Sequence, residues 1–210
     1  MPRKKETKDK TISTLIKSDE KTNQEKNINS REEKKSKPKI KALFSQGLII
    51  TENSNEAREL YNLNRYGTLL EDGKVQLSQV EAFYLLEKEK LEIYDLKKII
   101  TKEDFLKKAT KIDKNFIVRY SAYKDLRNRG YIVKTALKFG ADFRVYDRGI
   151  KPGEDHAKWI VYPVKEDSSL TWYEFAAKNR VAHSTRKRLL LAVVDDELDI
   201  SYWECRWLRP

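Results

Sequence analysis

The sequence predicts an α+β protein with mixed α/β character, in which a small N-terminal α+β domain precedes a second domain with a mixed central sheet flanked by helices. Three observations predict this fold class. A polar segment ends near residue 38, short helical and strand-like patterns alternate to about residue 100, and a longer helix followed by strand-like runs fills the remainder. We therefore divide the 210 residues into a tail (1–38), an N-terminal domain (39–110) and a C-terminal domain (111–210).

The tail, residues 1–38, is dominated by Lys, Glu, Asn, Ser and Thr. So little apolar surface cannot offset the entropy lost on ordering, so the composition predicts disorder. Residues 1–39 hold 13 Lys/Arg and 7 Asp/Glu, which assigns +6 of the net charge of +11 to this end of the chain. Excess positive charge favours an anionic partner, and a basic arm that scans nucleic acid is the alternative interpretation of the tail.

Composition excludes several classes of protein. The single cysteine, Cys205, rules out a disulfide framework and a cysteine-based zinc site within one chain, and its alternating surroundings predict a partly buried, unreactive thiol. No apolar run approaches the roughly 18 residues of a membrane span. The N-terminus lacks a signal-peptide pattern, so we expect a soluble protein in the reducing cytoplasm.

The N-terminal domain is read from strand patterns and helix caps. Residues 42–51, "ALFSQGLIIT", are strand material, and Ser54 caps a helix over "NEARELYNLNRY". Asp72–Gly73 separates two short apolar runs, which predicts a hairpin. Ser78 caps a second helix, and the strand "LEIYD" follows it. Nothing in this domain suggests chemistry.

The C-terminal domain begins with helices. Thr101 and Asp104 open one helix in an arrangement like a capping box. The run "NFIVRYSAYKDLRNRG" is a longer amphipathic helix that Gly130 ends. A later helix, "TWYEFAAKNRVAHS", is capped by Ser169 or Thr171.

Strands account for the rest of this domain. The runs "YIVKTALKF", "ADFRVYD" and "HAKWIVYPV" follow a period of two and predict consecutive strands. The continuous apolar run "RLLLAVV" predicts a central strand covered on both faces. An acidic turn, "DDELD", leads to a final strand, "ISYWECRWL".

Three side chains near strand ends and loops suggest a reaction. Phosphodiester cleavage without a metal needs a base for the nucleophile, an acid for the leaving oxygen and a cation for the charged phosphorane. Tyr146 ends one strand, His156 follows a Gly/Pro-containing loop, and Lys187 precedes the apolar run. Spacing alone leaves the plainer alternatives open: a packed tyrosine, an exposed histidine and a solvated lysine. A metal-dependent nuclease that uses Asp142, Glu154 and Lys158 is a further alternative, although the spacing of these residues is irregular.

A family resemblance supports the first of these interpretations. The segments "YKDLRNRGYIVKTALKFGADFRVYDRG", "DHAKWIVYPV" and "RVAHSTRKRLLLAVVD" closely resemble the catalytic domain of the archaeal tRNA-splicing endonuclease family. The resemblance covers residues 115–210, while residues 39–100 resemble the N-terminal domain of that family in size and layout. Ala136 departs from the pattern, because the family often has glycine before "LKFG". The resemblance implies a nuclease-like C-terminal domain.

The resemblance also implies a role for each candidate. Tyr146 matches the general base that deprotonates a ribose 2′-hydroxyl, His156 the general acid for the departing 5′-oxygen, and Lys187 the cation that stabilises the phosphate. The products would carry a 2′,3′-cyclic phosphate and a 5′-hydroxyl, without metal or cofactor. A free tyrosine has a pKa near 10, which is high for a group that acts as a base. The alternative in which Tyr146 and His156 exchange the acid and base roles therefore stays open.

The implied substrate is precursor tRNA folded into a bulge–helix–bulge, which proteins recognise by shape and splayed bases. Arg180 and Trp207, the latter expected in the last strand, are the best matches for side chains that stack on a bulge base. We interpret His183 as structural.

The resemblance further implies a homotetramer, arranged as a dimer of dimers. An acidic loop of Asp195, Asp196, Glu197 and Asp199 would dock into a basic cleft of a neighbouring subunit. The final strand would pair with its two-fold mate. A non-catalytic structural or RNA-binding subunit of a heteromeric endonuclease is the alternative from a different class.

Overall fold

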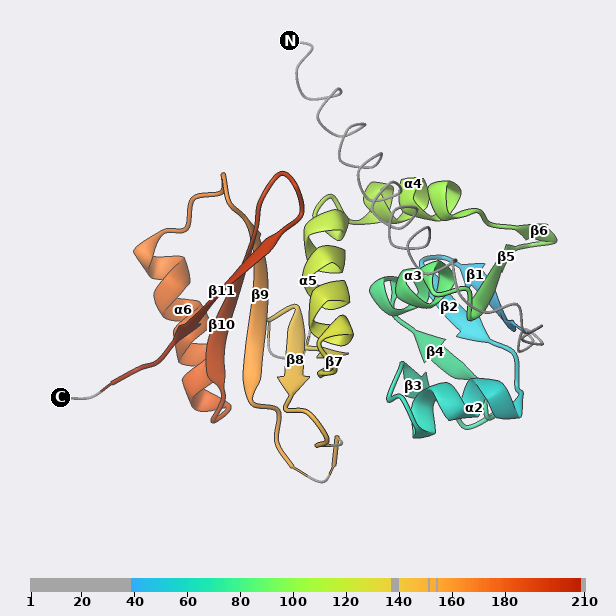
Figure 1. Cartoon of the computed structure of the whole chain (residues 1–210), viewed down its shortest axis with the longest axis horizontal. Helices are drawn as coiled ribbons and strands as arrows, with labels where there is room; N and C mark the ends of the chain where they lie inside the picture. Colours follow the sequence, from blue (N-terminus) through green and yellow to red (C-terminus); the bar gives the residue numbers. More distant parts are fainter. Residues whose placement is uncertain (1–38, 137–139, 151, 154, 209–210) are drawn as a thin grey trace, which may run out of the picture.

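The computed structural model describes residues 39–136, 140–150, 152–153 and 155–208. Two sheets of different strand order form the two halves of this part of the chain. Helix α5 (Phe116–Asn128) lies between the halves and contacts both, so the α+β class with a mixed C-terminal sheet flanked by helices is confirmed (Figure 1). The disorder predicted for residues 1–38 lies outside the described residues.

The N-terminal half contains a six-stranded mixed sheet in the order β3-β4-β2-β1-β5-β6. β1 pairs antiparallel with β2 and parallel with β5. The predicted hairpin around Asp72–Gly73 is confirmed, because β3 and β4 pair antiparallel on either side of it. The strand bounds are β1 Ile40–Ser45, β2 Leu48–Thr51, β3 Thr68–Leu69, β4 Val75–Leu77, β5 Leu91–Asp95 and β6 Lys98–Ile99.

The strand material predicted over residues 42–51 is confirmed, but it is divided into two strands by a turn that the sequence analysis did not identify. Gln46 and Gly47 have φ values of 49° and 83°, so the chain reverses here and forms a tight hairpin between β1 and β2. Two successive positive φ angles match the twist of the flanking strands, which favours this kind of turn. The apolar residues on both sides hid the turn in the sequence.

The predicted helix starts are confirmed by their caps. Ser54 accepts a hydrogen bond from Ala57 N at the start of α2 (Asn55–Asn62), and Ser78 forms a full capping box at the start of α3 (Gln79–Glu87). Thr101 accepts from Asp104 N at the start of α4 (Lys102–Ile112). Each cap satisfies a backbone N–H that the first helical turn would leave unpaired.

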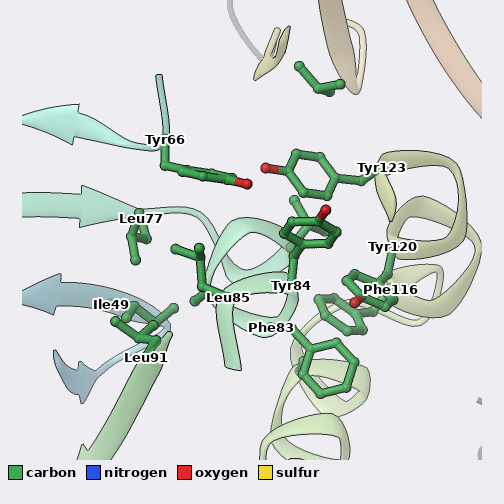
Figure 2. Close-up of a cluster of buried hydrophobic side chains, with 14 of the residues drawn as sticks. Ile49, Tyr66, Leu77, Phe83, Tyr84, Leu85, Leu91, Phe116, Tyr120 and Tyr123 are labelled. Atoms are coloured by element: carbon green, nitrogen blue, oxygen red, sulfur yellow. The ribbon is translucent and has the colours of Figure 1, made fainter. Parts of the chain in front are cut away.

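Aromatic side chains join the two halves in one continuous core. The ring of Phe83 on α3 packs against Phe105 on α4 and against Phe116 and Tyr120 on α5, with centroids 4.7–5.9 Å apart. Figure 2 shows the rings of Phe83, Phe116 and Tyr120 in the same cluster as aliphatic residues of the N-terminal sheet, such as Leu77. Aromatic pairs add stability beyond the area they bury, so this cluster fixes α5 as a shared support. Gly130, with φ 87°, follows the end of α5 as predicted.

The C-terminal half is a five-stranded mixed sheet in the order β11-β10-β9-β8-β7. β9 and β10 run parallel and are connected through α6 (Trp172–Ser184), which Thr171 caps with a capping box. The strand bounds are β7 Ile132–Thr135, β8 Phe143–Tyr146, β9 Trp159–Lys165, β10 Arg188–Val194 and β11 Ile200–Cys205. β9 starts at Trp159, three residues after the start of its predicted run, and ends at Lys165, one residue beyond that run, which leaves His156 in the preceding loop.

β10 is an interior strand covered on both faces, as its apolar run predicted, although β9 and not β10 is the middle strand of the sheet. Leu190 and Ala192 belong to the core shared with α5, whereas Leu189 packs in a second cluster with Ala182 of α6. Cys205 at the end of β11 is half-buried, and burial raises the pKa of its thiol. No helix of the described residues is long and apolar enough to cross a membrane.

Candidate active site

The loop between β8 and β9 is closed at its base by an ion pair. Asp147, which follows Tyr146, lies 2.7 Å from Lys158 Nζ through its Oδ2 atom. Lys158 N also donates to Val145 O, at 2.9 Å, which extends the pairing of the two strands. The hydrogen bond from Lys158, followed by one from the Arg148 amide, holds the pKa of Asp147 below its usual value. Residues at the two ends of this loop are therefore neighbours in space.

This closure brings His156 to the same site as Tyr146. Both line a pocket of about 540 Å³, together with Arg144, Thr185 and Lys187. Tyr146 is 5 % exposed, whereas His156 is exposed. The backbone N–H of His156 donates a hydrogen bond to Asp155 Oδ1 at 2.6 Å. A fixed phenol and an accessible imidazole thus face one hollow.

The turn after α6 holds the backbone of Lys187. Arg186 has φ 55°, its N–H donates to His183 O at 3.0 Å, and Lys187 N donates to Ala182 O at 2.8 Å. These two bonds form a Schellman motif, in which the left-handed residue is usually glycine. The left-handed conformation costs an arginine about 1–2 kcal/mol, so the turn is held by its hydrogen bonds and by the strand that follows.

The start of β10 completes the assembly. Arg188 N donates to Lys158 O at 3.0 Å, so Lys187 lies beside the end of the histidine loop. Lys187 Nζ donates to Thr185 O at 2.8 Å, which points the amine at the end of α6. Figure 1 shows the β8–β9 loop at the end of the sheet where β10 begins. Tyr146, His156 and Lys187 therefore line one pocket, although 41 positions separate the first from the last.

The pocket is lined by two cationic side chains, Arg144 and Lys187, and by one carboxylate, Asp155. Burial lowers the pKa of Lys187 from the ordinary lysine value, and the positive charge of Arg144 lowers it further. A second hollow of about 320 Å³ shares His156 with the first and is lined also by Arg186 and Arg188. Such a surface suits a phosphodiester chain, because guanidinium groups match phosphate geometry.

Sequence reasoning missed Arg144 as a contributor to this pocket, and it missed Asp147 as a residue that closes the loop beside the pocket. Arg144 is two residues before Tyr146 on β8, and this spacing on a strand signals a shared face. The ion pair between Asp147 and Lys158 has no local signal in the sequence, because the two residues meet only when the loop is closed.

The predicted RNA-binding pair lies elsewhere on the domain. Arg180 is exposed near the end of α6, and Trp207 is 46 % exposed. The assignment of Trp207 to the last strand is wrong, because β11 ends at Cys205. The ring of His183 lies 4.5 Å from the indole of Trp207, and His183 follows Arg180 by three positions on one helix face. His183 thus supports the tryptophan on the side of α6 that carries the arginine.

The acidic residues form the turn between β10 and β11. Asp195 Oδ1 accepts from Asp199 N at 2.8 Å, and Asp195 N donates to Asp199 O at 3.1 Å. Asp196 forms an ion pair with Lys165 at 3.1 Å, and the Glu197 carboxylate makes no hydrogen bond or ion pair with another described residue. The turn lies at the opposite end of β10 from the pocket.

The alternative metal site is not assembled by the residues that are described. Asp142 precedes β8 and lies 2.7 Å from Arg119 Nε, whereas Lys158 is beside the far end of that strand. The four residues of β8 separate Asp142 from the position of Lys158 by about 13 Å along the strand, at the usual rise per residue. Glu154 lies outside the described residues, and among those described no group of three or more His, Cys, Asp or Glu side chains is arranged to hold a metal.

Fold and site together define a two-part α+β protein whose C-terminal sheet carries a cationic pocket with a tyrosine, a histidine and a lysine. The profile described as "tRNA intron endonuclease, catalytic C-terminal domain" matches residues 116–202, and the one described as "tRNA intron endonuclease, N-terminal domain" matches residues 40–106. The chain belongs to the tRNA-splicing endonuclease family.

Three relatives, each named tRNA-splicing endonuclease, illustrate the similarity. The protein from Nanoarchaeum equitans is 51 % identical over 141 residues, which cover 64 % of this chain and 90 % of the relative. The protein from Thermococcus gammatolerans is 40 % identical over 161 residues, covering 77 % and 94 %. The protein from Methanothermobacter thermautotrophicus is 37 % identical over 172 residues, covering 82 % and 99 %.

Proposed function

We propose that this chain is the catalytic subunit of an endonuclease that cleaves precursor tRNA at bulge–helix–bulge intron boundaries without a metal. The observation that carries the proposal is the single pocket lined by Tyr146, His156 and Lys187. Family membership supports the substrate class, because the relatives are named for tRNA splicing. The exposed cations of the adjoining hollow suit the flanking phosphates of such an RNA.

The reaction needs no nucleophile from the protein. The ribose 2′-oxygen forms a bond to phosphorus as the bond from phosphorus to the 5′-oxygen breaks. Tyr146 takes the proton of the 2′-hydroxyl, His156 gives a proton to the 5′-oxygen, and Lys187 stabilises the charge on the phosphorane. The products are a 2′,3′-cyclic phosphate and a 5′-hydroxyl. Exchange of the acid and base roles between Tyr146 and His156 gives the same products.

RNA holding and assembly complete the proposal. Arg180 and Trp207 stack on a bulge base of the substrate bound to an opposing subunit, since both are exposed on one side of α6. The turn of Asp195, Asp196, Glu197 and Asp199 docks into a basic cleft of a neighbouring subunit. β11, an edge strand of its sheet, pairs with its two-fold mate, and a homotetramer results.

Cleavage of a bulge–helix–bulge RNA by the pure protein in excess EDTA tests the proposal. We expect cleavage to persist and to leave cyclic phosphate ends, which a phosphatase does not remove without prior ring opening. Loss of cleavage in EDTA that Mg²⁺ restores would contradict the metal-independent mechanism. No cleavage under either condition would favour the non-catalytic subunit of a heteromeric enzyme.

A further inference from the structure

Arg144 is the pocket cation that the proposed mechanism does not use. It lies on β8 two residues before Tyr146, so the two side chains share one face of the strand. Its guanidinium carbon lies 6.0 Å from the centroid of the Tyr146 ring, and both residues line the 540 Å³ pocket together with Lys187. Arg144 is therefore in reach of whatever occupies that pocket.

The guanidinium of Arg144 differs from those of the arginines of this domain that form ion pairs. Its Nε atom is buried and has no hydrogen-bond partner within the described residues. By contrast, Arg188 lies 3.3 Å from a Glu204 oxygen, and Arg129 lies 2.7 Å from Asp125. A buried polar group without a partner costs free energy, and a charged group costs more.

The neighbours of Arg144 increase that cost. Burial is the main cause of the lowered pKa of Lys187 and of Lys134. The positive charge of Arg144 lowers both pKa values further. Arg144 and Lys187 thus repel one another in the pocket that both line, and no carboxylate of the described residues forms an ion pair with Arg144. Such an arrangement is stabilised when an anion binds among the cations.

We propose that Arg144 binds the scissile phosphate together with Lys187 and donates hydrogen bonds to the non-bridging oxygens of the phosphorane. The inference rests on the proposed function, since it requires an RNA phosphate in the pocket. Arg144 makes and breaks no covalent bond in the reaction. The planar guanidinium donates two parallel hydrogen bonds to one phosphate, which a lysine cannot do.

Single-turnover cleavage of a bulge–helix–bulge RNA by Arg144→Ala tests this role. We expect the rate at saturating enzyme to fall by about 10²–10³-fold, the usual effect of removing one donor to a developing oxyanion, with the Kd for RNA within about threefold of wild type. Arg144→Lys should recover only part of the rate. Arg129→Ala is the matched control, because it removes one positive charge from an arginine that has a carboxylate partner outside the pocket.

Two further measurements separate a catalytic from a structural role. Guanidinium chloride at millimolar concentration should restore cleavage by Arg144→Ala but not by His156→Ala, and the Tm of Arg144→Ala should match or exceed that of wild type. Cleavage by Arg144→Ala within threefold of wild type would overturn the inference while the proposed function stands. A lower Tm without guanidinium rescue would make Arg144 structural. Failure of the wild-type protein to cleave would overturn both.

Discussion

Glu81 in the N-terminal half and Arg144 in the C-terminal half are both charged residues with buried polar atoms, and they are satisfied in opposite ways. Glu81 is 4 % exposed, and its carboxylate accepts hydrogen bonds from Gly67 N at 2.8 Å and from Ser78 N and Oγ at 2.9 and 2.7 Å. Arg144 has a buried Nε that lacks a partner among the residues that the structure describes.

This difference separates a structural charge from a functional one. A buried charge whose hydrogen bonds all close within the fold stabilises that fold, and its removal leaves donors unsatisfied. A buried charge whose partners are missing within the fold is held for a ligand. The N-terminal half therefore contributes support through α3 and α5, whereas the open electrostatics are concentrated at one end of the C-terminal sheet.

Loss of the histidine should give the largest effect. We expect His156→Ala to lower the rate of RNA cleavage by about 10²–10⁴-fold, the usual range for a general acid, with RNA binding and Tm largely kept because the side chain is exposed. Single-turnover kinetics and filter binding measure the two quantities. His183→Ala is the control for the single-turnover rate alone, because that histidine packs on Trp207 outside the pocket and its loss acts on RNA binding. An unchanged rate in His156→Ala would contradict the assignment.

Loss of Glu81 should act on stability alone. We expect Glu81→Ala to lower the free energy of unfolding by about 3 kcal/mol, because Gly67 N and the Ser78 donors lose their acceptor. Urea unfolding followed by circular dichroism measures the change. Glu81→Gln, which keeps an amide oxygen in place, should lose less. Activity per folded molecule should stay unchanged, and a large activity loss at full folding would break the proposed division between the halves.

The acidic turn contains carboxylates that are hydrogen-bonded within the fold and carboxylates that are open to a partner. Asp195 closes the turn by accepting a hydrogen bond from Asp199 N, whereas Asp196 pairs with the partly exposed Lys165. The Glu197 carboxylate is unpaired within the part of the chain that the structure describes. Neutralising Asp195, Asp196 and Glu197 together should shift sedimentation from tetramer towards dimer. An intact tetramer would refute the docking role. Asp199→Asn, at the base of the turn, should have the smaller effect.

The pH dependence of cleavage should show a smaller effect that depends on Lys187. Its pKa is lowered by burial and by Arg144, so the amine loses its charge at a lower pH than an ordinary lysine. Cleavage that needs this charge should fall as pH rises through the lowered pKa. For the same reason, stability should rise over that interval, since burying the charged amine is unfavourable.

Lys187→Arg tests this titration directly. A guanidinium stays charged over the accessible range, so the fall of kcat/KM should move to higher pH, even if the maximum rate drops. Profiles for the two proteins, measured from pH 6 to 10, would show the difference. Identical alkaline limbs would assign the titration to another group.

Local chemistry made much of the fold predictable. The caps Ser54, Ser78, Thr101 and Thr171 and the helix stop at Gly130 act within a few residues of where they stand. The apolar run of β10 predicted a strand covered on both faces, because this pattern is also carried by consecutive residues. The β1–β2 turn escaped because Gln46 adopts positive φ without a sequence signal of its own.

The sequence by itself determined which chemical groups are present, where the elements begin and which motifs link the chain to its family. The tertiary structure alone decided which groups meet. The contacts that build the pocket join distant positions, such as Arg188 N to Lys158 O and Asp147 to Lys158, and the exposed or buried state of Arg144 follows from them. Closure of loops and pairing of strands depend on the whole core, and no local pattern records them.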